Sequence, residues 1–254
     1  MADAALNPAV LAGAAVPTGH AASTSPFQFK MAPKVAMWLF LGTEVMFFTG
    51  LIGSYLVLRA GSPATAYSAV YPPNAAPAVA KANVDDPIYG FTSWPRPYDS
   101  ATNPLNIPMT WANTLILMSS SVTLSLAIMA IQRGKRAQFL TLLVATLLLG
   151  STFLGIQIFE YYELMFPHEP YPIGVSPTGA FTPDVSLFAS AFFVMTGFHG
   201  MHVFAGAILL LWITTRAFLG YYTKDNHISV EIAALYWHFV DLVWIVLFTV
   251  VYLI

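Results

Sequence analysis

The chain has 254 residues, of which 57% are hydrophobic and 9% are charged, and its net charge is −2. Soluble domains carry roughly a quarter charged residues, so this composition, with a mean hydropathy of +0.67, predicts an integral membrane protein. The small negative charge gives no basic surface for nucleic acid. The absence of cysteine excludes disulfides, iron–sulfur clusters and thiolate metal sites.

The N-terminal 32 residues differ from the rest of the chain. They are rich in alanine, and their first basic residue is Lys30. We expect residues 1–32 to form a disordered tail and not a cleavable signal. The remaining residues, 33–254, are expected to form one membrane domain.

Five stretches are long and apolar enough to cross a bilayer, which takes about 20 residues in a helix. They lie at 34–58, 107–131, 139–166, 185–215 and 231–254. No separate soluble domain is left over. The sequence therefore predicts an all-α, polytopic membrane protein, a bundle of five transmembrane helices.

The connections between the expected spans are unequal. Residues 132–138 form a short basic turn, whereas residues 60–106 hold eight of the 18 prolines. Proline removes a backbone donor and breaks helices, so we expect loop 60–106 to be irregular and to lie on a partner or on lipid headgroups. Residues 167–184 form a second proline-rich loop.

The distribution of Lys and Arg predicts the orientation, because basic residues concentrate on the cytoplasmic side. Seven lie on the N-terminal side of the expected bundle and three on the other. The seven are Lys30, Lys34, Arg133, Lys135, Arg136, Arg216 and Lys224; the three are Arg59, Lys81 and Arg96. We therefore expect a cytoplasmic N-terminus and a C-terminus on the outer side.

Several polar residues fall where hydrocarbon is expected. Glu44 follows Lys34 by ten residues, which at ~1.5 Å per residue places it near mid-bilayer. Its neighbours in sequence are aromatic and supply no cation. Ionisable groups at this depth are costly, so Glu44 is a candidate for proton or lipid handling.

Other polar residues occur as pairs at helical spacing. They are His199 with His202, His238 with Asp241, and Gln157, Glu160 and Glu163 near the outer end of the third span. Each set is compatible with hydrogen bonds between helices, with haem or metal ligation, or with a proton relay or ion site. The spacing alone does not decide between these alternatives.

Small residues in two spans predict close helix packing. They are Gly42, Gly50 and Gly53 in the first span, and Gly197, Gly200 and Gly206 in the fourth.

Several longer motifs cover nearly all of the membrane part. Residues 42–50 read GTEVMFFTG, residues 103–108 read NPLNIP, and residues 157–163 read QIFEYYE. Residues 192–203 read FFVMTGFHGMHV, and residues 236–244 read YWHFVDLVW. With these motifs the chain resembles subunit III of haem–copper terminal oxidases, most closely the cytochrome c oxidase type.

The resemblance has one clear departure. Subunit III typically has seven spans, and the five expected here correspond to the family's third to seventh. Shorter, five-span forms are known in bacterial oxidases, so the resemblance implies a multi-pass protein of a bacterial cytoplasmic membrane.

The resemblance implies a non-redox accessory subunit with no catalytic centre and no metal of its own. Haem and copper would reside in oxidase subunits I and II, which are its expected partners. Whether the complex joins a respiratory supercomplex is left open. Its family role is to stabilise subunit I, to hold phospholipids and to support proton uptake.

Individual residues take roles from the same resemblance. Glu44 matches the family's membrane carboxylate that reacts with carbodiimides, in a proton or lipid pocket. Arg216 matches an arginine that binds a lipid headgroup. The remaining polar residues are then structural: His199, His202, His238, Asp241, Gln157, Glu160 and Glu163.

Three alternatives stay open. The chain could be the equivalent subunit of a quinol oxidase or a subunit III-like protein associated with nitric oxide reductase. Glu44 and Tyr162 favour the cytochrome c branch, because quinol-type relatives commonly lack both. A proton-coupled transporter is an alternative of another class, but we see no internal repeat of the kind such transporters show.

Overall fold

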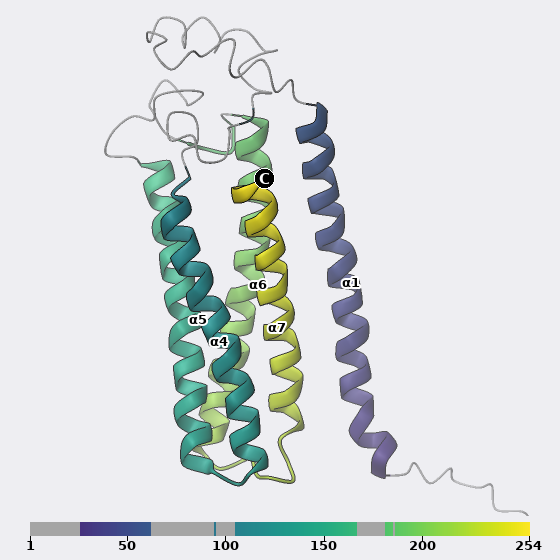
Figure 1. The fold of residues 1–254 in the computed structure, drawn as a ribbon. Coiled ribbons are helices and arrows are strands. Elements are labelled where there is room, and N and C mark those ends of the chain that lie inside the picture. The colour runs from purple at the N-terminus through teal and green to yellow at the C-terminus, as the bar shows by residue number, and fades with distance from the viewer. Residues whose placement is uncertain (1–25, 62–93, 95–104, 167–180, 185) are drawn as a thin grey trace, which may run out of the picture.

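A computed structural model describes residues 26–61, 94, 105–166, 181–184 and 186–254 (Figure 1). Within these ranges the secondary structure is helical, and an isolated bridge between Thr223 and Asn226 is the sole β feature. The helices are α1 (Pro26–Gly61), α4 (Ile107–Gln132), α5 (Arg136–Met165), α6 (Leu187–Phe218) and α7 (Ile228–Phe248), followed by a π-helical turn, η2 (Thr249–Leu253). All five long helices are apolar enough to cross a membrane, which confirms the predicted class.

Helix α1 begins earlier than the sequence predicted. It starts at Pro26, so the end of the expected tail at residue 32 is already helical, while residues 1–25 lie outside the described part. The helix continues through Pro33, which removes one backbone donor. Prolines are tolerated in membrane helices because neighbouring groups compensate for the lost bond, so Pro33 does not end α1, and its membrane-spanning part begins at Ala32, close to the expected Lys34.

Side-chain caps fix where the central helices begin. The Asn106 side chain accepts a hydrogen bond from the Met109 amide at 3.1 Å, and Ser186 does the same for Ala189 at 3.1 Å. Such caps satisfy backbone donors that the first helical turn leaves unpaired. Between α4 and α5, Gly134 adopts φ +73°, a left-handed conformation that glycine allows and that closes the predicted basic turn.

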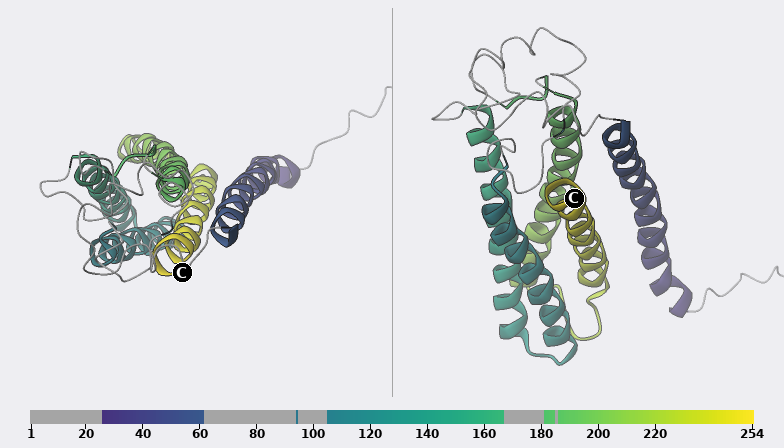
Figure 2. Two further views of the ribbon diagram at one scale, coloured as in Figure 1. Left: turned by 90° about the horizontal axis from the view of Figure 1, so that it is seen from above. Right: turned by 45° about the horizontal axis from the view of Figure 1, so that its top comes forward.

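Helices α4, α5, α6 and α7 surround one core, whereas α1 lies outside this group, beside α7 (Figures 1 and 2). The core is aromatic, and its largest fully buried side chains include Trp237, Trp244 and Phe153. The Trp244 ring meets the Phe153 ring edge-on at 5.0 Å. Most of α1 is exposed, including Trp38, Leu39 and the other large apolar residues of its outer face.

Trp94 is the one described residue in the middle of the expected loop 60–106. Its ring packs edge-on against Tyr55 of α1 at 5.0 Å and against Phe188 of α6 at 5.4 Å. Its indole N–H donates to the Tyr55 hydroxyl at 3.3 Å. Trp94 thus links α1 to α6 within this chain, a contact that the sequence did not indicate.

The predicted close packing at glycines occurs at only some of them. A Cβ at Gly206 would lie 2.9 Å from the Trp237 ring, and one at Gly150 would lie 2.6 Å from the same ring. Both glycines therefore make room for one indole. At Gly42, Gly50, Gly53 and Gly200 a Cβ would meet nothing within 4 Å, so no packing in this chain requires glycine there.

Candidate functional site

Glu44 and His202 form a pair between α1 and α6. Glu44 Oε2 lies 3.0 Å from His202 Nε2, although the two residues are 158 positions apart in sequence. Each side chain is 18% exposed. The partner that the sequence around Glu44 lacks is therefore supplied by a different helix.

The contact of the other ring nitrogen of His202, Nδ1, shows that this nitrogen carries a hydrogen. His202 Nδ1 lies 2.7 Å from the Phe198 carbonyl oxygen, which can only accept, so Nδ1 carries a hydrogen. Nε2 then either accepts a hydrogen bond from a protonated Glu44 or donates one to an ionised Glu44. In both states the pair shares one proton and has no net charge, which lowers the cost of its burial.

Aromatic rings enclose this pair. Phe48 meets the His202 ring edge-on at 5.1 Å, and Phe47 lies tilted at 6.3 Å. The Tyr236 hydroxyl of α7 donates to the His202 backbone carbonyl at 3.0 Å. The pair is thus positioned by three helices, and shared-proton chemistry is what this arrangement can perform.

His238 makes a separate contact. Its Nε2 lies 3.2 Å from the Ser125 hydroxyl of α4, so it joins α7 to α4. Asp241, one turn along α7, is 7% exposed. No hydrogen bond between this pair and His199 or His202 is found in the described part of the chain.

His199 occupies a different environment from His202. It is 1% exposed, and its ring stacks on Trp244 at 4.9 Å and meets Phe153 edge-on at 6.2 Å. Neither ring nitrogen has a hydrogen-bond partner among the described residues. The spacing predicted that His199 and His202 share one face of the helix. Their side chains nevertheless contact different neighbours.

The three polar residues of α5 also lie in different environments. Glu160 is 4% exposed and accepts a hydrogen bond from the Thr110 hydroxyl of α4 at 3.0 Å. Gln157 is 5% exposed and lines an apolar groove between α5 and α6. Glu163 is partly buried near the end of the helix.

Arg216 lies in the last turn of α6. Its guanidinium lies 4.8 Å from the centre of the Trp212 ring and 4.4 Å from that of Tyr221. These cation–π contacts fix a positive charge at the helix end, where it also complements the helix dipole.

Two further polar contacts hold α1. Lys34 contacts Glu231 of α7, and Glu231 also lies 3.1 Å from His227. At the opposite end, Arg59 donates to the backbone oxygen of Ile254. Neither contact was foreseen, because each joins residues that are far apart in sequence.

Sequence reasoning also missed a set of hydroxyls on α4 that accept from buried indoles. Trp244 donates to Thr114 at 3.0 Å, and Trp237 donates to Ser120 at 2.9 Å. Both hydroxyls are buried, but Ser120 follows Thr114 by six residues, about 120° around the helix, so their spacing does not mark one face.

The described residues contain no cluster of three or more His, Asp or Glu side chains suited to hold a metal ion. The polar contacts between helices are pairs: Glu44 with His202, Glu160 with Thr110, and His238 with Ser125.

The family model for cytochrome c oxidase subunit III matches residues 86–254, two thirds of the chain. The chain belongs to the cytochrome c oxidase subunit III family. This match covers α4 to α7 and leaves out α1.

Individual subunit III sequences extend the similarity. Cytochrome c oxidase subunit 3 from Loxodonta africana is 34% identical over 86% of this chain and 68% of its own length. That from Papio hamadryas is 33% identical over 92% of this chain and 72% of its own length, which must include part of α1. That from Arabidopsis thaliana is 40% identical over 63% of this chain. The chain spans 54% of the Arabidopsis relative's length.

Proposed function

We propose that this chain is a non-redox accessory subunit of a respiratory cytochrome c oxidase, the complex that reduces oxygen to water and pumps protons. The family membership supports this proposal. Its partners are then oxidase subunits I and II, which carry the haem and copper, while this chain stabilises subunit I, supports proton uptake and holds phospholipids. We further propose a bacterial cytoplasmic membrane, which the five-span resemblance supports, and a cytoplasmic N-terminus, which the distribution of Lys and Arg supports.

The Glu44–His202 pair is the observation that carries the proposed role. It lies near the middle of two spans, and one proton can move between Oε2 and Nε2 without a change in net charge. Transfer of the proton within the pair therefore leaves no net charge in hydrocarbon. The pair can thus hold a proton beside subunit I while redox chemistry takes place in the partner.

Arg216 supports the lipid part of the proposal. Its guanidinium is held by Trp212 and Tyr221 at the end of α6. Arg216 follows His202 by 14 residues, which places the two about 40° apart around the helix and ~21 Å apart along it. A phospholipid on this face would have its phosphate at Arg216 and its chains running toward Glu44.

The test compares the oxidase complex containing the unchanged chain with one containing Glu44→Gln. An amide can still donate to His202 Nε2, so we expect the complex to assemble with its full haem absorbance. Carbodiimide labelling of this chain should be lost, and inactivation during turnover should become faster. Loss of the complex in Glu44→Gln would contradict the proton role, and a haem absorbance band in the purified chain alone would contradict the accessory role.

A further inference from the structure

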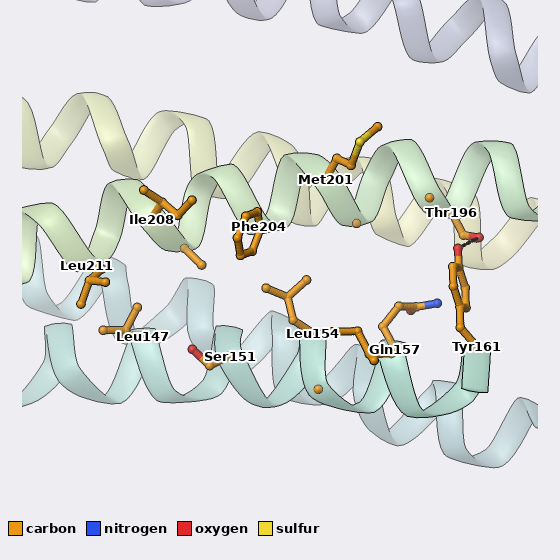
Figure 3. Close-up of a pocket in the computed structure, with 15 residues that line it drawn as sticks. Leu147, Ser151, Leu154, Gln157, Tyr161, Thr196, Met201, Phe204, Ile208 and Leu211 are labelled. Atoms are coloured by element: carbon orange, nitrogen blue, oxygen red, sulfur yellow. Dashed lines mark hydrogen bonds between the residues drawn. The ribbon is translucent and has the colours of Figure 1, made fainter. Parts of the chain in front are cut away.

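An apolar groove runs between α5 and α6 on a different side of α6 from the Glu44–His202 pair (Figure 3). Its volume is about 670 Å³. It extends from Leu147 and Leu211 at one end to Tyr161 and Thr196 at the other. Gly200, one of its lining residues, lies about 160° from His202 around the helix axis.

Two glycines deepen this groove. A Cβ built at Gly155 of α5 or at Gly200 of α6 would meet nothing within 4 Å. Neither glycine is therefore needed for packing inside the chain, in contrast to Gly150 and Gly206. Their missing side chains leave space in the groove.

The groove contains one buried polar group that has nothing to bind. Gln157 is 5% exposed, and neither its nitrogen nor its oxygen has a hydrogen-bond partner among the described residues. Figure 3 shows its carboxamide between the two helices, on the side toward Tyr161 and Thr196, whose hydroxyls bond to each other at 2.6 Å. Buried amides are nearly always paired, so this one indicates a ligand.

The dimensions of the groove select the class of ligand. Fourteen residues separate Leu147 from Tyr161, which corresponds to ~21 Å along α5. A volume of about 670 Å³ spread over that length makes the groove long and narrow, a shape that accommodates an extended hydrocarbon chain.

The depth of Gln157 in the membrane indicates which polar group of the ligand it contacts. Gln157 lies six residues, or ~9 Å, below Glu163 at the end of the span, and the headgroup layer on each side of a bilayer is ~5–7 Å thick. Its amide is thus just inside the hydrocarbon border, the depth at which the ester carbonyls of phospholipids lie. The ten residues from Gln157 down to Leu147 span ~15 Å, half of the hydrocarbon thickness.

We propose that the α5–α6 groove binds one acyl chain of a membrane phospholipid, whose ester carbonyl accepts a hydrogen bond from the Gln157 carboxamide. This site is distinct from the face that carries Glu44 and Arg216. It rests on the proposed function in that this chain holds phospholipids, and it adds a site that requires neither the proton pair nor the headgroup arginine.

The test uses the oxidase complex in nanodiscs that contain a phospholipid with a photoactivatable diazirine in one acyl chain. After irradiation, peptide mapping should find label on the α5 and α6 residues that line the groove. Gly200→Leu fills the groove and should lower this label about tenfold. Ala205→Leu, an exposed position on another face of α6, should leave the label unchanged.

Two further variants test the Gln157 hydrogen bond and the independence of the groove from Arg216. Gln157→Leu keeps the groove apolar but removes the donor, and the loss of one hydrogen bond should lower the label by about two- to tenfold. Arg216→Ala should leave the groove label unchanged, so a failure of the lipid role at Arg216 is distinguishable from a failure here.

Three results would overturn the proposal. One is groove labelling that is equal in Gly200→Leu and in the unchanged chain. Another is stronger labelling by a diazirine-bearing isoprenoid quinone at equal concentration. The third is cross-linking of a photoreactive residue placed at Leu154 to another oxidase subunit in place of lipid.

Discussion

Helix α1 is joined to its neighbours by Lys34, Glu44 and Arg59, whereas the best-buried contacts among α4 to α7, those around Trp237 and Trp244, are made by neutral groups. Along α1, Lys34, Glu44 and Arg59 each meet a partner on another element, at one end, near the middle and at the other end. The four-helix group instead uses hydroxyls, indole N–H groups and aromatic rings.

The difference follows from burial. The Trp237 ring is 1% exposed, and a charge beside it would have no water to solvate it. Only 11% of the residues in the most apolar 18-residue stretch of α1 are buried, compared with 61% for the span that includes α7. With few apolar neighbours inside this chain, α1 gains little from packing, and polar contacts at three levels hold it to the bundle. Two substitutions in the core and one at α1 test this contrast.

The largest effect is expected at Gly150. A methyl group there would lie 2.6 Å from Trp237 Cη2, and Gly206 confines the same ring from α6. Because the ring also donates to Ser120, it has little freedom to move away. Gly150→Ala should lower the free energy of unfolding by about 3 kcal/mol, the upper range for overpacking.

The control is Gly155→Ala on the same helix, where a Cβ meets nothing within 4 Å. Both variants are compared by unfolding of the detergent-solubilised chain in a denaturing detergent titration. Equal stability of Gly150→Ala and Gly155→Ala would show that Trp237 is not confined.

A smaller effect is expected at the Glu44–His202 pair. Glu44→Leu leaves His202 Nε2 without a partner, and an unsatisfied polar group costs about 1–2 kcal/mol at a partly exposed position. Glu44→Gln retains a donor and should cost less. The coupling energy between Glu44→Leu and His202→Leu in a double-mutant cycle, measured in the same titration, should be about 1 kcal/mol.

If Glu44→Gln were as destabilising as Glu44→Leu, the pair would depend on an ionised carboxylate. A hydrogen bond alone would then not account for the position of α1.

The five spans could be predicted from the sequence because apolar length is a local property. All four expected boundaries for α4 and α5 lie within three residues of those observed. The polar partners could not be predicted. Nothing near Glu44 indicates His202, since the contact depends on how α1 and α6 are placed.

The glycines illustrate the same limit. Gly42, Gly50 and Gly53 have the spacing expected of a packing face, yet open space surrounds them, while Gly150, which the spacing did not single out, lies against Trp237. Spacing shows which residues share a face of a helix, but it does not show what that face meets. The unpaired amide of Gln157 is likewise visible only when its neighbours are known.

The smallest effect is expected at Ser120, which accepts a hydrogen bond from the Trp237 indole at 2.9 Å. Hydrogen bonds between membrane helices contribute on average about 0.6 kcal/mol, so Ser120→Ala should lower the free energy of unfolding by about that amount. Ser119→Ala is the matched control, because Ser119 is exposed and bonds within its own helix to Leu115. A loss above about 2 kcal/mol in Ser120→Ala would mean that neutral hydrogen bonds, more than the fit of the indole between two glycines, hold the four-helix core.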